Sequence, residues 1–215
     1  DDSCRRLSRL LANFGIMPYN KVAIFSQNMP NWTVAFFAIT AYGRIAVPML
    51  TDLSENEISN ILTHSDSKAL FVSKKLLSKV PMDILDRMSV VICTDDLSVI
   101  QSNDDAYTCD GQITAPNEDD IAAVIYTSGT TGSAKGVMLS HRNLCASVHS
   151  AWHAHPVGSR DVFLSILPMA HAYEMSIGML YPFATGAKVY YISKPPTPTV
   201  LISALKEIRP TTMLS

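Results

Sequence analysis

A dense run of hydroxyl and glycine residues, followed by one lysine, is the part of the sequence whose residue types could do chemistry. Residues 127–133 read TSGTTGS, which is five hydroxyl side chains and two glycines, and Lys135 follows after Ala134. Glycine lets backbone N–H groups approach an anion closely, hydroxyl groups add further donors, and an ammonium group adds positive charge. Segment 126–136 therefore predicts a binding site for a polyphosphate.

This segment does not match the ordinary Walker-type phosphate loop, which requires Gly, four residues and then Gly-Lys-Ser/Thr. Gly129 and Lys135 fit that pattern, but position 134 is Ala and position 136 is Gly. A Walker loop also leads directly into a helix, whereas residues 137–139 (VML) predict a strand. The plain alternative is a hairpin turn without a ligand, although such turns seldom place a lysine after so many hydroxyls.

Strand and helix signals alternate along the chain and define the elements that must position this segment. The apolar runs typical of strands are 21–26, 45–50, 68–73, 89–94, 121–126, 136–139, 161–167, 188–192 and 211–215. The segments typical of helices are 7–14, 30–42, 55–62, 74–87, 141–153, 172–184 and 198–208. This alternation predicts an α/β fold with a mostly parallel sheet flanked by helices. Parallel strands deliver the loops that follow them to the carboxyl edge of the sheet, where open α/β folds bind ligands.

Composition excludes several classes of function. The net charge is −2, which gives no general attraction to nucleic acid or to anionic lipid. Residues 94–120 hold eight acidic residues and no Lys or Arg, without the spacing of a calcium loop, so that 95–120 is predicted to be an exposed connection. The longest apolar stretch, 32–42, is too short to span a bilayer.

The cysteines and the two ends of the chain bear on its cellular compartment and on whether it is part of a longer protein. Cys4, Cys93, Cys109 and Cys145 lie far apart without a CxxC pair, which favours reduced thiols over a disulfide framework or a zinc ribbon. No basic-then-apolar leader opens the chain, so a cytoplasmic protein without a transmembrane segment is expected. Both ends read as if they were cut inside an element, and we expect the chain to be part of a longer protein.

Three segments resemble one family. YTSGTTGSAKGVMLSH, at 126–141, resembles the phosphate-loop signature of the adenylate-forming superfamily of acyl-CoA synthetases, luciferases and peptide-synthetase adenylation domains. AYGRIAVP at 41–48, followed by SENEISNILTHSDSKALF, resembles an early segment of that family. LPMAHAYE at 167–174 resembles its next segment, in the form typical of long-chain fatty acid–CoA ligases. The family usually has proline where Ala134 stands, which leaves the turn less rigid but removes no donor.

The resemblance implies a reaction in two halves. A carboxylate attacks the α-phosphorus of ATP and releases pyrophosphate, and the thiol of coenzyme A then displaces AMP. The residues implied to hold the β- and γ-phosphates are Thr127, Ser128, Gly129, Thr130, Thr131, Gly132, Ser133 and Lys135. Lys135 would balance the charge of the departing pyrophosphate, and the hydroxyl group of Thr130 or Thr131 would lie near Mg²⁺. His171 would lie beside the substrate carboxylate.

Other residues have simpler interpretations. His149 and His153 stand four residues apart on a predicted helix, but no glutamate follows the first, so a surface pair is favoured over a zinc site. Cys145, on the same helix, is expected to be inert. Glu174 is expected to interact with the dipole of a helix and has no catalytic role. Three residues fit either an acyl channel or an ordinary core: Met175, Met179 and Tyr181.

Three functions stay open at this stage. The first is ATP-dependent activation of a long-chain fatty acid to acyl-CoA, in which this chain would be a partial N-terminal AMP-binding domain that is inactive alone. The second keeps the chemistry but uses an aryl or amino acid. The third is a nucleotide-binding module without catalysis. The partners implied are small molecules (ATP, the carboxylic acid and coenzyme A) together with the rest of the same chain, and peripheral membrane association of the parent enzyme stays open.

Overall fold

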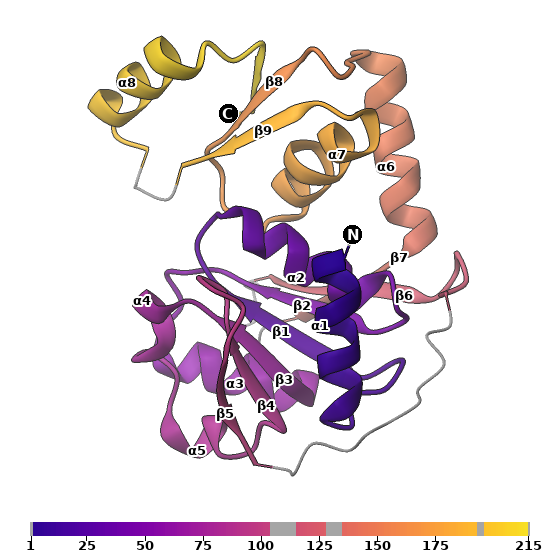
Figure 1. Cartoon of the computed structure of the whole chain (residues 1–215), viewed down its shortest axis with the longest axis vertical. Helices are drawn as coiled ribbons and strands as arrows, with labels where there is room; N and C mark the ends of the chain where they lie inside the picture. Colours follow the sequence, from indigo (N-terminus) through magenta and orange to yellow (C-terminus); the bar gives the residue numbers. More distant parts are fainter. Residues whose placement is uncertain (1, 104–114, 128–134, 193–195, 215) are drawn as a thin grey trace. The chain divides into compact units, whose positions relative to one another are not determined.

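The computed structural model describes residues 2–103, 115–127, 135–192 and 196–214 (Figure 1). The chain divides into two compact units: unit 1 comprises Asp1–Ser26 and Asn31–His141, and unit 2 comprises Gln27–Pro30 and Arg142–Ser215. Each unit has its own sheet and is described by itself. The short early segment in unit 2 therefore packs with residues from the second half of the chain.

Unit 1 is built on a seven-stranded sheet. Its strands are β1 (Lys21–Phe25), β2 (Ile45–Met49), β3 (Ser67–Val72), β4 (Val90–Cys93), β5 (Val99–Ser102), β6 (Ile121–Thr127) and β7 (Lys135–Ser140). Their spatial order is β5-β4-β3-β1-β2-β6-β7. The five inner strands are parallel, whereas the edge strands β5 and β7 run antiparallel to their neighbours. The mostly parallel sheet that the sequence predicts is confirmed.

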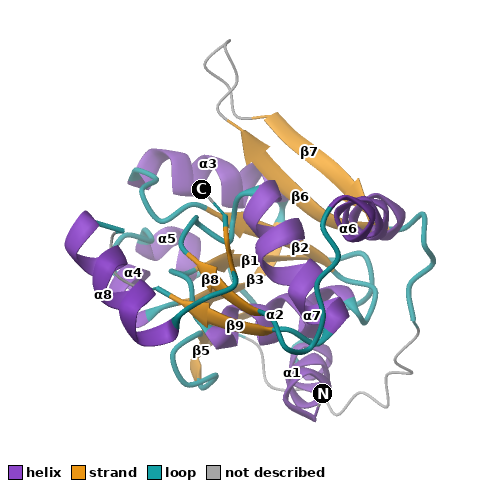
Figure 2. Ribbon diagram, turned by 90° about the horizontal axis from the view of Figure 1, so that it is seen from above, coloured by secondary structure: helices purple, strands orange, loops and turns teal. Residues whose placement is uncertain are grey.

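Helices flank both faces of this sheet. They are α1 (Asp2–Asn13), α2 (Pro30–Thr40), α3 (Glu55–Ser65), α4 (Lys74–Leu77) and α5 (Met82–Leu85). Figure 2 shows α3, α4 and α5 on one side of the sheet and α1 and α2 on the other. The start of α3 is fixed by a capping box: the side chain of Ser54 accepts a hydrogen bond from the backbone of Glu57, whose carboxylate accepts one in return.

The acidic connection contains an element that the sequence does not reveal. β5 lies within segment 95–120 and pairs with β4, with Val99 opposite Ile92, although most of its residues are exposed. A strand of four residues is too short to show an alternating pattern, which explains why it was missed. The central part of the acidic segment, 104–114, lies outside the described residues.

Unit 2 carries a three-stranded parallel sheet in the order β10-β8-β9. Its strands are β8 (Val162–Ser165), β9 (Lys188–Tyr191) and β10 (Thr212–Met213), and its helices are α6 (His141–Ala154, continued from unit 1), η1 (Glu174–Leu180), α7 (Tyr181–Thr185) and α8 (Pro198–Ile208). The helix predicted over 172–184 is present, but η1 has the wider hydrogen-bonding pattern of a π-helix. Such segments are rare and are often found at functional sites. Within the described residues, no helix combines the length and apolar character needed to cross a membrane.

Candidate active site

The strands on either side of the predicted phosphate-binding segment form a hairpin. Thr127 is the last residue of β6, Lys135 is the first residue of β7, and the two face one another across the antiparallel ladder. Both ends of the segment are therefore held together. A strand follows Lys135 rather than a helix, which confirms that the segment is not a Walker-type loop. The six remaining predicted residues lie outside the described part of the chain: Ser128, Gly129, Thr130, Thr131, Gly132 and Ser133.

The direction of β6 decides where this hairpin leaves the sheet. β6 runs parallel to β2, with Ala123 opposite Ala46, so its carboxyl end lies on the same edge as those of the other inner strands. At this edge the buried hydroxyl group of Thr94 donates to that of Ser26 at 3.0 Å. Open α/β sheets bind ligands outside the carboxyl ends of their strands. The hairpin is therefore at the edge that the sequence analysis expects.

Tyr126 braces the base of the hairpin. Its hydroxyl oxygen lies 2.7 Å from Nδ1 of His64 on α3, and the two rings meet edge to face. Burial raises the pKa of the Tyr126 phenol above its ordinary value. Gly136 faces this ring, because a Cβ atom there would lie 2.8 Å from Cγ1 of Val124 and 3.4 Å from Cζ of Tyr126. The glycine thus allows Tyr126 to pack against β7 next to Lys135.

The side chain of Lys135 is exposed at the first residue of β7. It has no carboxylate partner among the residues that the structure describes. The neighbouring Thr127 is exposed as well. An ammonium and a hydroxyl group that stand side by side at the carboxyl edge of a sheet suit a phosphate group.

His171 belongs to unit 2 and follows the end of β8. It is exposed, its backbone N–H donates to the carbonyl of Pro168 at 2.9 Å, and its own carbonyl accepts from Met175 at 2.9 Å. His171 therefore sits in a tight turn directly before η1. Lys135 and His171 lie in different units, and each is described within its own.

Asn28 holds the segment that leads to His171, and sequence reasoning missed it. Its side-chain amide donates to the carbonyl of Leu167 at 2.7 Å and accepts from the backbone N–H of Met169 at 2.9 Å. It also donates to Oγ of Ser165 at 3.3 Å. Both ends of the Asn28 amide are thus used by one turn of backbone. A lone asparagine after a strand usually signals no more than a turn, so the sequence offers no signal for this role.

Glu174 is a second residue whose importance the sequence does not show. Its side chain is fully buried, and Oε1 accepts a hydrogen bond of 2.5 Å from Oγ of Ser165. Its other oxygen, Oε2, has no hydrogen-bond partner in the described structure. Burial raises the pKa of this carboxyl group to about 7, and the hydrogen bond from Ser165 opposes the shift. From sequence, Glu174 is expected only to interact with a helix dipole. The structure instead shows a carboxyl group that is buried inside unit 2 and bonded to Ser165.

The raised pKa of Glu174 predicts how stability depends on pH. Between pH 4.5 and 7 the folded chain binds more protons at this site than the unfolded chain, so the free energy of unfolding falls as pH rises through that interval. The total loss is about 3 kcal/mol, from about 1.4 kcal/mol per pKa unit. Glu174→Gln removes this titration, so the variant is expected to gain stability over the wild type as pH rises.

Urea unfolding of the 215-residue chain at pH 5 and at pH 8 measures how the free energy of unfolding changes in the wild type and in Glu174→Gln. Glu55→Gln is the matched control, because Glu55 is exposed at the first residue of α3. It removes one exposed carboxylate and keeps Glu174, so its free energy of unfolding should still fall between pH 5 and pH 8. If the free energy of unfolding changed equally with pH in the wild type and in Glu174→Gln, the raised pKa of Glu174 would not be the cause of the pH dependence.

The other residues singled out by sequence lie on the surface of α6 or are buried in η1 and α7. His149 and His153 are exposed, and their Nε2 atoms lie 3.3 Å apart on α6. No cluster of three or more potential metal ligands occurs among the described residues. Cys145 is a free, exposed thiol on the same helix. Three side chains that fit either a channel or a core are buried: Met175, Met179 and Tyr181.

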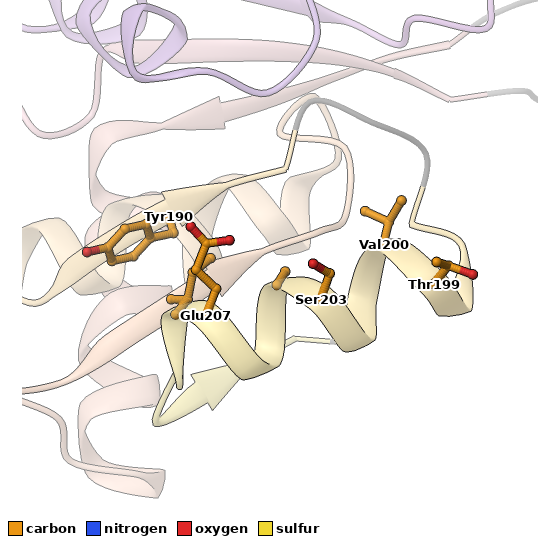
Figure 3. A pocket seen from close by; sticks show the side chains of 7 residues that line it. Tyr190, Thr199, Val200, Ser203 and Glu207 are labelled. Atoms are coloured by element: carbon orange, nitrogen blue, oxygen red, sulfur yellow. The ribbon is translucent and has the colours of Figure 1, made fainter.

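A separate hollow of about 590 Å³ lies between β9 and α8. Figure 3 shows Tyr190 and Glu207 at one end of it and Val200 and Thr199 at the other. Among the residues that the structure describes, Glu207 is the one charged lining residue, and neither Thr127, Lys135 nor His171 lines the hollow. We therefore do not include this hollow in the candidate site.

Comparison with known proteins identifies the family. A model of the family described as AMP-binding enzyme matches residues 1–215, which is the whole chain. The chain belongs to this family. Solved structures share the fold of this chain. O-succinylbenzoate coenzyme A synthetase from Bacillus subtilis in complex with AMP has a TM-score of 0.81 at 23% identity, covering 99% of this chain and 53% of that chain. The same synthetase in complex with ATP and magnesium ion has a TM-score of 0.79 at 22% identity, covering 99% and 54%.

Relatives of this chain include proteins named as acyl-CoA synthetases or ligases. Long chain acyl-CoA synthetase 6, peroxisomal, of Arabidopsis thaliana is 28% identical over 199 residues, which cover 84% of this chain and 28% of that protein. Long-chain-fatty-acid–CoA ligase 1 of Cavia porcellus is 25% identical over 234 residues, covering 97% and 33%. The chain spans about a third of the length of these relatives.

Proposed function

We propose that the protein containing this chain activates a carboxylic acid with ATP to an acyl-adenylate and then forms an acyl-CoA, releasing pyrophosphate and AMP. The observation that carries the proposal is the pairing of Thr127 with Lys135, which joins the two ends of the hydroxyl-rich segment at the carboxyl edge of β6. Membership of the AMP-binding family supports a nucleotide as the ligand. The names of the relatives support a coenzyme A ligase.

The first half-reaction brings a carboxylate to a highly charged triphosphate, so the protein must neutralise charge and hold the attack in line. Residues 127–133 would grip the β- and γ-phosphates, and Lys135 would offset the charge of the departing pyrophosphate. An exposed ammonium without a carboxylate partner in the described chain fits that task. His171 would contact the substrate carboxylate and shift between the two half-reactions.

The donor set also fits a hard cation. Mg²⁺ prefers oxygen ligands and is usually held through substrate phosphates and a small number of protein oxygens. The hydroxyl group of Thr130 or Thr131 is the protein oxygen that we propose. When bound, Mg²⁺ supplies charge neutralisation at the phosphate oxygens.

The substrate that we propose is a long-chain fatty acid. The LPMAHAYE segment and the names of the two relatives favour it. An aryl acid is the second candidate, because the synthetase from Bacillus subtilis that shares this fold is named for O-succinylbenzoate. An amino acid, or nucleotide binding without catalysis, are the remaining outcomes of the test.

Pyrophosphate exchange tests the proposal. The protein to assay is the product of the longest open reading frame that contains these 215 residues, which we call the parent protein. The expected result is that pyrophosphate exchanges into ATP only when a fatty acid is present. Exchange that occurs only with an aryl or amino acid would show that the substrate belongs to that class instead. ATP binding without exchange for any carboxylic acid would overturn catalysis. The 215-residue chain alone, which spans about a third of its relatives, is expected to give no acyl-adenylate.

A further inference from the structure

The turn that carries His171 is held from two sides by side chains that no part of the proposed chemistry uses. On one side, Asn28 binds Leu167 and Met169. On the other side, Glu174 lies three residues after His171 and is tied to Ser165 at the end of β8. All of these residues belong to unit 2. The exposed imidazole therefore projects from a segment whose flanks are anchored inside the unit.

A continuous chain of hydrogen bonds joins the two anchors. Ser165 donates to the carboxyl group of Glu174 and accepts from Nδ2 of Asn28. Because the Ser165 hydroxyl has one proton, its bond to Glu174 leaves a lone pair facing Asn28. Nδ2 then uses its second proton for the carbonyl of Leu167. Each bond in the chain fixes the direction of the next.

The chemistry of Asn28 suits this task in a way that few side chains could. A carboxamide presents a donor and an acceptor in one plane, and the turn at Pro168 offers a carbonyl on one side and an N–H on the other. Asn28 is 7% exposed, so water cannot readily replace these bonds. An aspartate of the same shape would have acceptors only and would face the carbonyl of Leu167 with a negative oxygen.

Glu174 is held equally closely. Gly178, one turn further along η1, has no room for a Cβ atom, which would lie 2.4 Å from Cδ of Glu174. The carboxyl group thus lies directly over the glycine and has little freedom to leave Ser165. A buried acid that binds one hydroxyl group and touches a glycine has no evident value for stability, because burial of a carboxyl group is costly.

We propose that Asn28 and Glu174 are positioning residues that fix the place of His171 for the carboxylate substrate through Ser165. This inference rests on the proposed function. The two residues do not contact the substrate; they act through the backbone of the His171 turn. Disturbing either should weaken use of the carboxylic acid and spare the binding of ATP.

Steady-state kinetics of the parent protein tests this inference with four variants. Asn28→Asp and Glu174→Met each interrupt the series of hydrogen bonds that runs from Asn28 through Ser165 to Glu174. Glu174→Gln keeps an oxygen that can accept the hydrogen bond from Ser165. Ser67→Ala is the matched control, since it removes a buried hydroxyl pair with Ser65 in unit 1. We expect the first two to raise the KM for the acid about tenfold, as loss of one or two buried hydrogen bonds allows, with the KM for ATP unchanged. Glu174→Gln should recover wild-type KM values near pH 7, and Ser67→Ala should alter neither KM.

Hydrogen exchange without substrates gives an independent reading of the same bonds. The backbone N–H of Met169 donates to Oδ1 of Asn28, so Asn28→Ala, which removes this acceptor, should speed the hydrogen exchange of Met169 markedly, whereas Ser67→Ala should not. If Asn28→Asp does not fold, Ser165→Ala interrupts the series of hydrogen bonds at its middle and replaces Asn28→Asp in the kinetic measurement.

The outcomes separate the two proposals. A wild-type parent protein that shows no pyrophosphate exchange with any carboxylic acid would overturn the proposed function, whatever the hydrogen-exchange rate of Met169. Wild-type activity together with equal changes in both KM values, or with none, would overturn the positioning role alone. Unchanged hydrogen exchange at the backbone N–H of Met169 in Asn28→Ala would overturn it as well.

Discussion

Replacing Gly178 with alanine is expected to lower the free energy of unfolding by about 3 kcal/mol, the upper end of the usual cost of overpacking. The added Cβ atom would lie 2.4 Å from Cδ and 2.5 Å from Oε1 of Glu174, closer than real Cβ contacts. Glu174 cannot swing away at little cost, because its side chain is fully buried and bonded to Ser165. Urea denaturation of the 215-residue chain measures the effect.

Gly158→Ala is the matched control for that experiment. Gly158 belongs to the same unit, and a Cβ atom there would meet nothing within 4 Å. It should change stability by less than about 0.5 kcal/mol. A double variant with Glu174→Ala tests the cause, since shortening residue 174 makes room and should reduce the cost of the alanine at 178. Equal costs in both backgrounds would show that the clash is not with Glu174.

Replacing Lys135 with alanine is expected to reduce pyrophosphate exchange by the parent protein about a hundredfold, in the range seen when one donor to a developing charge is removed. Lys135 is exposed and paired with Thr127 at the base of the hairpin, so its removal should leave the sheet intact. The loss should lie in the use of ATP and pyrophosphate, and binding of the acid should change little.

Lys188→Ala controls for the loss of a surface charge, because Lys188 is likewise an exposed lysine at the first residue of a strand. It should leave exchange unchanged. Lys135→Arg keeps the positive charge and should retain part of the activity. Exchange by Lys135→Ala that equals the wild type would remove this lysine from the site.

The elements could be predicted from sequence because their patterns are local. The apolar run of β6 and the capping box of α3 each report a structure that depends on neighbouring residues. The exclusion of a Walker loop depended on one such pattern, the strand after Lys135, and it is confirmed. β5 was missed because four residues that gain their order from pairing with β4 carry no periodic signal of their own.

The supporting residues of the His171 turn could not be predicted for the opposite reason. Glutamate is usually found at the surface, so the sequence predicts an exposed side chain at position 174. Its buried contacts are Gly178, one turn away, and Ser165, on the strand β8. The one local hint is that Glu174 and Gly178 stand at i and i+4 in an otherwise apolar stretch, EMSIGML. Asn28 offers no hint at all, since its partners lie in a distant part of the sequence.

That separation has a consequence for how the chain is made. Met169 follows Asn28 by 141 residues. At ordinary rates of translation, about 7 to 28 s pass between the synthesis of the two. During that time Asn28 has no partner to bind, and closing so long a loop adds to the entropic cost of the contact. The turn that presents His171 is thus completed late, when the strands of unit 1 have already left the ribosome.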